Sequence, residues 1–369
     1  MKIIADKNIP FLKGVAEQFG EVEYLSGNEF TKQSIKDADT LIVRTVTRFD
    51  ETILSGSNVK LICSATIGYD HIDTAYCDSH GIIWKNAPGC NSGSVQQYIA
   101  SSLIAIAGQK DISLEGKTIG IIGVGNVGKK VARACSILGM RVLLNDPPRQ
   151  EVEGDVDFVS LETIKQEADF ITFHTPLIKE GKYRTFHLAD QNFFTSLARK
   201  PIIINSARGG IIDTSAIKRA IAADNISGTI IDCWENEPNI DIEYLNMVDI
   251  ATPHIAGYSA DGKSNATRMS LESVADFYGF DKSPIEAVKP PQPEQPIINL
   301  DHFASDKVRN AILATYNPLR DFAALKASPS DFKRLRNEYP LRREYPAYTI
   351  MNAKAKEGKI LSELGFIIG

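Results

Sequence analysis

Residues 117–146 read KTIGIIGVGNVGKKVARACSILGMRVLLND, and this stretch carries the strongest fold signal in the chain. The apolar run TIGII predicts a buried strand, VGKKVARACSILG has helical spacing, and RVLLN predicts the next strand. The GxGxxG loop between the first strand and the helix is a weak signal by itself, because many turns are rich in glycine. In this strand–loop–helix context it is typical of the nucleotide-binding unit of a doubly wound sheet.

Each glycine of the loop has its own expected role. Gly123 permits a tight turn, Gly125 lets the backbone approach a pyrophosphate, and Gly128 lets the helix pack closely on the strand. The N-terminus of the following helix then faces the phosphates with free N–H groups. The alternative is a purely structural glycine turn.

The cofactor is predicted from the end of the second strand. Asp146 lies 18 residues beyond Gly128, close to the ~20 expected for the acid that binds a ribose. A carboxylate there accepts from both ribose hydroxyls and repels a 2′-phosphate, so NAD is favoured over NADP. Arg149 lies nearby and leaves the strictness of that preference open.

Strand and helix patterns alternate along most of the chain. Five short apolar runs come first, and a long helix is predicted in SVQQYIASSLIAIAGQ. After the glycine loop follow the runs DFITFHTP, PIIINSARGG, GTIIDCWENEP and VDIATPHIAG. This alternation predicts an α/β protein with two doubly wound, Rossmann-like domains.

Four parts of the chain are predicted. Residues 1–92 and 258–285 form a substrate domain, 93–257 an NAD-binding domain, and 286–296 a proline-rich linker. Residues 297–369 form a small C-terminal α+β domain, rich in Arg and Tyr, which suits an interface. We therefore expect a two-fold homodimer.

Composition excludes several classes of protein. The net charge of −5 argues against binding to nucleic acid or an anionic membrane. No apolar stretch reaches the ~18 residues of a membrane span, and the start MKIIADKNIPF does not read as a signal peptide. Five cysteines without a CxxC pair indicate reduced thiols and a cytoplasmic protein.

Three polar motifs follow three of the predicted strands. Arg208 lies in NSARGG, Glu237 in DCWENEP and His254 in TPHIAG. Taken singly, they suit a surface turn, a solvated loop acid and a structural histidine. Together they supply what oxidation of a 2-hydroxy acid needs: a cation for the carboxylate, a base for the hydroxyl proton, and an acid that orients that base.

The other histidines are weaker candidates. His174 precedes Thr175 in a loop expected to border the nicotinamide, and the remaining ones lie outside any motif. No cluster of His, Cys and acidic residues has metal-ligand spacing, so no metal is expected.

The motifs GVGNVG, NSARGGIIDT, DCWENEP and TPHIAGYS, in this order and spacing, resemble those of the D-isomer-specific 2-hydroxyacid dehydrogenases over roughly residues 1–285. The resemblance implies that Arg208 binds substrate, that His254 is the acid/base, and that Glu237 assists it.

The resemblance also implies contacts to cofactor and substrate. The implied cofactor contacts are Gly123, Gly125, Asn126, Val127, Gly128, Asp146, Thr175, Ser206, Ala207, Arg208, Asp232 and Gly257. The implied substrate contacts are Thr45, Thr66 and Tyr258, with the loop 65–68 offering backbone N–H groups to the substrate carboxylate. For Thr45 and Thr66 the alternative is a hydroxyl that satisfies the local backbone.

The exact substrate stays open within the family. Phosphorylated and unphosphorylated small 2-hydroxy acids fit the same three residues, and a non-catalytic NAD-sensing protein on the same fold is a further alternative. A phosphorylated substrate needs local cations, and Arg44 and Arg48 flank Thr45. These two arginines are the predicted phosphate ligands.

Overall fold

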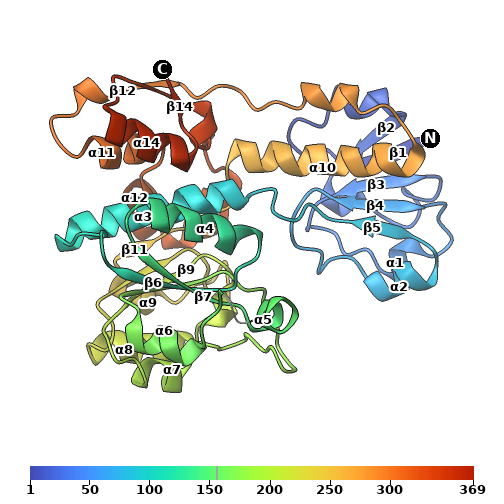
Figure 1. Ribbon diagram of the computed structural model, residues 1–369. Coiled ribbons are helices and arrows are strands. Elements are labelled where there is room, and N and C mark those ends of the chain that lie inside the picture. The colour runs from blue at the N-terminus through green and yellow to red at the C-terminus, as the bar shows by residue number, and fades with distance from the viewer. Residues whose placement is uncertain (155–156) are drawn as a thin grey trace. The chain divides into compact units, whose positions relative to one another are not determined.

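The computed structural model describes residues 1–154 and 157–369. The chain divides into two compact units (Figure 1). The first comprises residues 1–91 and 259–292, and the second comprises residues 92–258 and 293–369. No helix among the described residues is long and apolar enough to cross a membrane. All five cysteines are free and buried.

The first unit is built on a five-stranded parallel sheet with the order β2-β1-β3-β4-β5. Apolar side chains cover both faces and form two separate cores. Its strands are β1 (Lys2–Asp6), β2 (Glu21–Leu25), β3 (Thr40–Val43), β4 (Leu61–Ser64) and β5 (Ile83–Lys85). Its helices are α1 (Glu51–Leu54), α2 (Thr74–Ser79) and α10 (Ala260–Tyr278), with short 3-10 turns at Ala16–Gln18, Gly27–Glu29 and Ser283–Ala287.

The second unit contains a six-stranded parallel sheet with the order β11-β10-β9-β8-β6-β7. Its strands are β6 (Thr118–Ile122), β7 (Arg141–Asn145), β8 (Phe170–Phe173), β9 (Ile202–Asn205), β10 (Gly228–Ile231) and β11 (Ile250–Ala251). They coincide with the apolar runs that predicted them, so the predicted fold class is confirmed.

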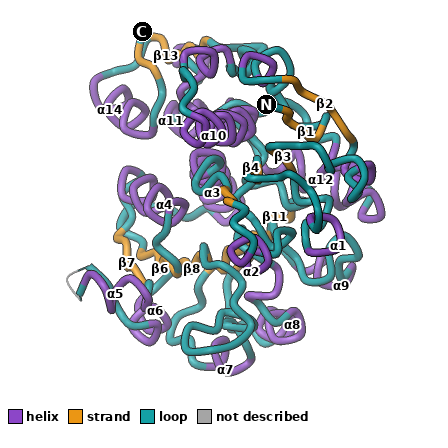
Figure 2. The backbone as a smooth tube through the Cα atoms, turned by 90° about the vertical axis from the view of Figure 1, so that its right-hand side faces the viewer, coloured by secondary structure: helices purple, strands orange, loops and turns teal. Residues whose placement is uncertain are grey.

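Helices cover both faces of this sheet (Figures 1 and 2). One face packs on α3 (Ser92–Lys110) and α4 (Asn126–Ile137). The other packs on α6 (Leu161–Glu167), α7 (Gln191–Thr195), α8 (Thr214–Ala222) and α9 (Ile242–Met247). The short α5 (Pro147–Glu153) follows β7, and a 3-10 turn, Gly209–Ile211, follows β9. Asp and Ser side chains cap the N-termini of α5 to α9, which starts each helix soon after its strand or loop.

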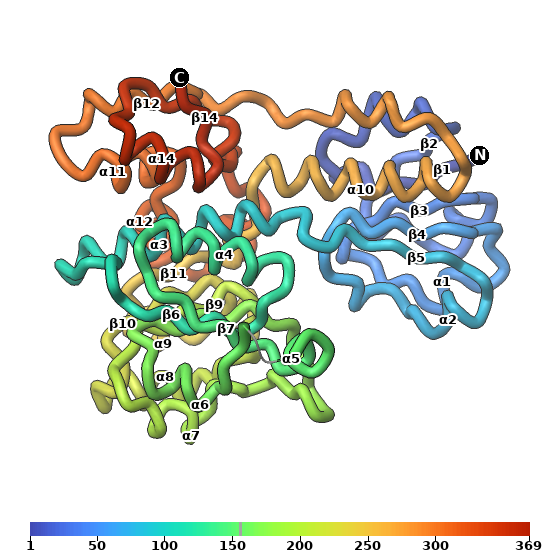
Figure 3. Tube along the Cα trace, viewed as in Figure 1, coloured from blue at the N-terminus to red at the C-terminus, as the bar shows by residue number. Residues whose placement is uncertain are grey.

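The C-terminal segment, residues 297–369, packs onto this second unit (Figure 3). Its three parallel strands are β12 (Ile297–Asn299), β13 (Thr349–Met351) and β14 (Ile367–Ile368). Its helices are α11 (Lys307–Thr315), α12 (Pro318–Ala327), α13 (Phe332–Asn337) and α14 (Ala355–Leu364), with 3-10 turns at Leu300–His302, Pro329–Asp331 and Tyr345–Ala347. Ile104 of α3 and Ala134 of α4 belong to the apolar core of this segment. It is therefore the small α+β element that was expected, built onto the NAD-binding unit.

Candidate active site

A histidine and a carboxylate lie in direct contact at the ends of β11 and β10. The Nδ1 atom of His254 is 2.7 Å from Oε2 of Glu237, and both side chains are about one-fifth to one-quarter exposed, at 25% and 18%. A carboxylate only accepts, so Nδ1 carries the proton. Nε2 has no hydrogen-bond partner within residues 1–154 and 157–369. The ring therefore presents a lone pair at Nε2, as a general base requires.

The carboxylate of Glu237 is held at its second oxygen. Oε1 accepts from the backbone N–H of Trp234 at 2.7 Å. The indole N–H of Trp234 donates to the carbonyl of Thr252 at 2.9 Å, which ties the loop after β10 to the loop after β11. Sequence reasoning missed this role of Trp234, although the residue lies inside the DCWENEP motif.

Asp232 holds the backbone around His254. It is fully buried, and its Oδ1 accepts from the Thr252 hydroxyl at 2.6 Å and from the N–H of Ile255 at 2.7 Å. Its Oδ2 accepts from the N–H of Ala256 at 3.0 Å. Burial raises the pKa of this carboxyl. Asp232 was predicted to contact the cofactor. In the structure, the contacts described for its carboxylate are all with other residues of the protein.

Arg208 follows β9 and presents an exposed guanidinium. Its Nη1 donates to the carbonyl of Ala207 at 2.8 Å, and no carboxylate within the described chain pairs with it. The next residue, Gly209, packs so closely on the loop after β10 that a Cβ would lie 1.9 Å from the carbonyl oxygen of Trp234. Glycine at this position therefore brings the Arg208 loop against the loop that carries Glu237.

The structure places Cys233 beside the pair, a grouping that spacing along the chain did not reveal. Ligand atoms of Cys233, Glu237 and His254 lie within 4.8 Å of one another. Burial and then the charge of Asp232 raise the pKa of the thiol well above its usual range. A metal needs the thiolate, so this cluster is poorly suited to one.

The glycine loop has the geometry that an approaching dinucleotide requires. Gly123 has a φ of +89°, and a Cβ on Gly128 would lie 2.1 Å from the carbonyl oxygen of Gly123. Around Gly125, which caps α4, the position of a Cβ is open for 4 Å. The tight turn, the close packing and the open approach therefore fall on the three glycines in the expected order.

Asp146 terminates β7 beside this loop. Its Oδ2 accepts from the N–H of Val124 at 2.8 Å and its Oδ1 from the N–H of Arg149 at 3.2 Å. Arg149 itself donates to the carbonyl of Val124 at 2.6 Å and pairs with Glu153. Arg149, the cation that left the choice between NAD and NADP open, is therefore already bound to an acid and a carbonyl.

Two buried hydroxyls lack partners at neighbouring strand ends. Oγ1 of Thr175, after β8, and Oγ of Ser206, after β9, are buried without a hydrogen bond in the described part of the chain. Buried polar groups are normally satisfied, so these two suit a bound ligand. Beside Thr175, burial lowers the pKa of His174 to about 3, which keeps that ring neutral.

The substrate contacts implied in the first unit have local roles. Thr45 is exposed after β3. The hydroxyl of Thr66 donates to the carbonyl of Gly68 at 3.0 Å, which matches the alternative of a satisfied local backbone. Arg44 pairs with Asp6 at 3.0 Å and Arg48 pairs with Asp50 at 3.1 Å, so each predicted phosphate ligand has an acidic neighbour.

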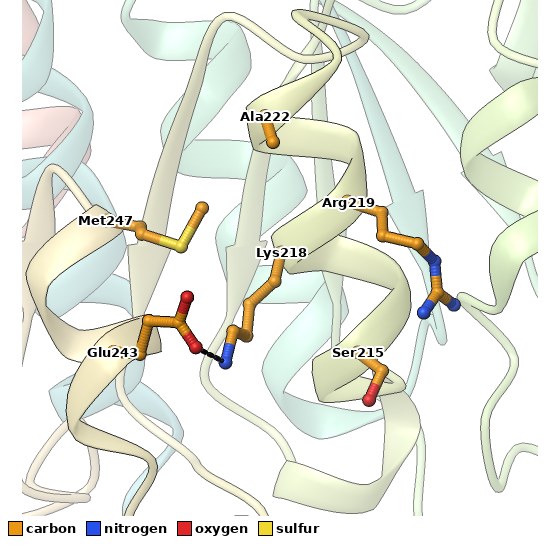
Figure 4. Close-up of a pocket in the computed structure, with 6 residues that line it drawn as sticks. All are labelled: Ser215, Lys218, Arg219, Ala222, Glu243 and Met247. Carbon is orange, nitrogen blue, oxygen red and sulfur yellow. Dashed lines mark hydrogen bonds and ion pairs between the residues drawn. The ribbon is translucent and has the colours of Figure 1, made fainter.

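A surface hollow elsewhere in the second unit contains none of the predicted residues. It lies between α8 and α9 (Figure 4), and its Lys218 pairs with Glu243 and with Asp241. Lys218 is thus already neutralised, and Arg219 bonds the side chain of Gln191, so the hollow is not a second candidate for the chemistry.

Comparison with known protein families supports the same interpretation. Residues 97–256 match the family described as D-isomer specific 2-hydroxyacid dehydrogenase, NAD binding domain. Residues 291–365 match a domain of unknown function, DUF3410. The NAD-binding domain predicted from the glycine loop is thereby confirmed, and NAD is the cofactor.

Individual relatives extend over the whole chain. An erythronate-4-phosphate dehydrogenase of Bacteroides thetaiotaomicron is 54% identical over 96% of this chain and 100% of its own length. One from Porphyromonas gingivalis is 43% identical, with both chains covered completely. The NAD+-bound 3-phosphoglycerate dehydrogenase of Entamoeba histolytica superposes with a TM-score of 0.63 at 27% identity, covering 76% of this chain and 95% of the other. The chain is an NAD-dependent 2-hydroxyacid dehydrogenase and belongs to the erythronate-4-phosphate dehydrogenase family.

Proposed function

We propose that this chain oxidises 4-phospho-D-erythronate to 2-oxo-3-hydroxy-4-phosphobutanoate, a step in the biosynthesis of pyridoxal 5′-phosphate. The observation that carries the proposal is the pairing of His254 with Glu237, which leaves Nε2 free, together with the guanidinium of Arg208, which no acid in the described chain neutralises. The names of the full-length relatives support the substrate. They disfavour a non-catalytic NAD-sensing protein.

In the proposed mechanism, His254 takes the proton of the C2 hydroxyl at Nε2. The glycine loop and Asp146 would hold NAD, which would supply the acceptor for the hydride of C2. The hydroxy acid thus loses a proton from its hydroxyl to His254 and a hydride from C2 to the cofactor, which leaves the 2-oxo acid. The carboxylate of Glu237 stabilises the imidazolium that forms. Arg208 binds the substrate carboxylate through two parallel N–H donors and so fixes the orientation of C2.

We further propose that Arg336 contributes to binding the substrate phosphate. Its guanidinium lies over the ring of Tyr258, 5.5 Å from the centroid. Its Nε is buried without a hydrogen bond, and no acid pairs with it in the described part of the chain. Arg44 and Arg48 each have a carboxylate neighbour. An arginine without such a neighbour has its N–H donors available for an anion. Thr45 and Thr66 stay proposed as substrate contacts.

Two substitutions in α13 distinguish phosphate binding by Arg336 from a general effect of positive charge. Arg336→Gln should raise the KM for the phosphorylated substrate roughly 10-fold or more, the value of a lost charged hydrogen bond. Arg334→Gln is the matched control, because Arg334 is on the same helix and pairs with Asp331 at 2.7 Å. Equal KM values for the two variants would remove Arg336 from the phosphate site.

We propose a homodimer that joins through the C-terminal sheet. Ile297, Thr349 and Ile367 are aligned across β12, β13 and β14, and the two isoleucines are 63% and 53% exposed. An aliphatic sheet face of this kind suits a second copy of the chain. Ile297→Glu with Ile367→Glu should yield monomers by light scattering. Ile242→Glu, at an exposed site on α9, should not. Deletion of the segment is unsuitable as a test, since it uncovers Ile104.

Absorbance of NADH with a panel of acids tests the activity. The panel holds 4-phospho-D-erythronate, 3-phospho-D-glycerate, D-glycerate and D-lactate. We expect the highest kcat/KM with 4-phospho-D-erythronate. A higher value with another acid would overturn the substrate, and bound NAD without turnover of any acid would favour the sensing protein. We also propose a cytoplasmic location, in line with the five free thiols.

A further inference from the structure

The backbone of the two residues that follow His254 is bound by two side chains of opposite charge. Asp232 accepts from the N–H groups of Ile255 and Ala256, at 2.7 and 3.0 Å. The guanidinium of Arg342 donates through Nη2 to the carbonyls of the same two residues, at 3.0 and 2.6 Å. Every backbone donor and acceptor of this short stretch is thus bound to a buried charged side chain.

Arg342 comes from the C-terminal segment and is rigidly enclosed. It is only 5% exposed. Its guanidinium lies 4.5 Å from the ring centroid of Tyr316 and 5.7 Å from that of Tyr339. It also donates to the hydroxyl of Ser94, which in turn donates to the carbonyl of Ala256 at 2.8 Å. Contact with both tyrosine rings and burial leave the guanidinium of Arg342 little freedom to move.

The hydroxyls of the two tyrosines share one acceptor. Tyr316 and Tyr339 both donate to Oδ2 of Asp321 at 2.9 Å. Burial raises the pKa of this carboxyl. The rings that enclose Arg342 are thereby fixed to α12, so that the position of the guanidinium is set by the C-terminal segment as a whole.

His254 needs such support because its backbone has a φ of +57°. This left-handed conformation is uncommon outside glycine and persists only where the surrounding structure imposes it. Without Arg342, the carbonyl of Ile255 keeps only the N–H of Tyr258 and that of Ala256 only the hydroxyl of Ser94 among the described residues, so the loop is less firmly held and can relax. The ring would then leave the carboxylate of Glu237, to which Nδ1 is bonded.

We propose that Arg342 is a positioning residue for His254, so that the C-terminal segment takes part in catalysis as well as in any assembly of subunits. This proposal rests on the proposed function, in which His254 is the base. A carbonyl-binding cation on one side of the loop and Asp232 on the other hold the imidazole in its reactive orientation.

Replacement of Arg342 tests the proposal by separating kcat from KM. Arg342→Met should lower kcat about 10- to 100-fold, within the range for a misplaced base, while the KM for NAD changes little. The primary deuterium isotope effect at C2 should rise, because the chemical step becomes slower. Arg342→Lys, which keeps a donor, should recover part of kcat. Arg334→Met is the control for charge, since its partners Asp331 and Glu338 lie at the surface.

A second measurement does not depend on turnover. The proton on Nδ1 of His254 should give a deshielded NMR signal that His254→Gln removes. Arg342→Met or, if that variant fails to fold, Ser94→Ala should weaken this signal while the thermal unfolding midpoint stays close to that of the Arg334→Met control. If the wild type oxidises no acid of the panel, the proposed function fails and this signal still tests the positioning. An unchanged signal, or an unchanged kcat and isotope effect, would overturn the role of Arg342.

Discussion

The second unit contains two histidine–glutamate pairs with nearly the same internal geometry. His254 and Glu237 are 2.7 Å apart, and so are His187 and Glu235. Both histidines have a positive φ, 57° and 53°. The side chains are also similarly exposed, at 25% and 28% for the rings. A search for a ring bonded to a carboxylate would therefore select both pairs.

The surroundings separate them. His187 bonds Glu235 through Nε2, and its ring stacks on Phe186 with the centroids 3.9 Å apart. The second oxygen of Glu235 accepts from the N–H of Thr214, the first residue of α8, at 2.9 Å. The backbone N–H of His187 donates to Gly210 at 2.8 Å. This pair therefore braces a loop and a helix end, whereas His254 lies directly after β11, at the edge of the sheet where the strand ends meet.

The comparison teaches that a ring–carboxylate bond does not define a base. Reactivity also needs the ring to lie at the strand ends where cofactor and substrate bind, with a cation there for the substrate carboxylate. Each prediction below changes one pair and uses the other as its control.

Removal of each imidazole should have the largest effect. His254→Gln should lower kcat for the hydroxy acid by up to ~10⁴-fold, the contribution of a general base. NAD affinity should stay nearly intact, because the glycine loop lies at other strand ends. His187→Gln should leave kcat within a few-fold. Steady-state NADH formation measures both, and similar losses in the two variants would erase the distinction.

Neutralising each acid should have the next largest effect. In Glu237→Gln the amide oxygen can still accept from Trp234, which turns the NH₂ group toward Nδ1 of His254. That ring then carries its proton on Nε2 and cannot accept another, so kcat should fall on the order of 10²-fold or more. Glu235→Gln, assayed in parallel, should retain most of kcat. A Glu237→Gln enzyme with a normal plateau rate would reduce Glu237 to a loop acid.

A cation lies near each pair, and the two should differ in their effect on KM. Arg208→Gln should raise the KM for the hydroxy acid about 10- to 100-fold, through loss of charged hydrogen bonds to its carboxylate. Arg184 lies over Phe186, 5.7 Å from the ring centroid, and Arg184→Gln should leave KM unchanged. Initial rates over a range of substrate concentrations decide the matter. A raised KM in both variants would point to a general effect of positive charge.

The smallest expected effect is on stability, to which Glu235 should contribute at least as much as Glu237. Glu235→Ala removes the acceptor for the N–H of Thr214 at the start of α8. Loss of such a helix-end acceptor costs about 0.5–2 kcal/mol of unfolding free energy. Glu237 accepts a hydrogen bond within a loop. Glu237→Ala should therefore lower the unfolding free energy no more than Glu235→Ala does, but should lower kcat far more. Urea unfolding followed by circular dichroism provides the values. Equal stability of Glu235→Ala and the wild type would contradict the bracing role.

Much of the fold and of the candidate site could be predicted from local pattern. The inner parallel strands of the two large sheets are buried on both faces, so each appears in the sequence as a short apolar run, whereas the edge strands β2, β5 and β7 are partly exposed. Polar residues directly after such runs lie at one edge of the sheet, which is why Arg208, Glu237 and His254 could be grouped from motifs alone. The glycine spacing and Asp146 predicted the dinucleotide for the same reason, since their roles depend on positions within a single strand–loop–helix unit.

Only the tertiary structure decided which partners those residues have. Nothing near His187 in the sequence distinguishes it from an unpaired histidine, because Glu235 lies 48 residues away. Asp232 and Arg342 meet the same two peptide units from 24 and 86 residues away in the chain. Such contacts depend on how helices and loops pack, and no short motif encodes them. Local motifs were therefore enough to propose the chemistry of the site, whereas the way the loop after β11 is held depends on contacts from the distant C-terminal segment.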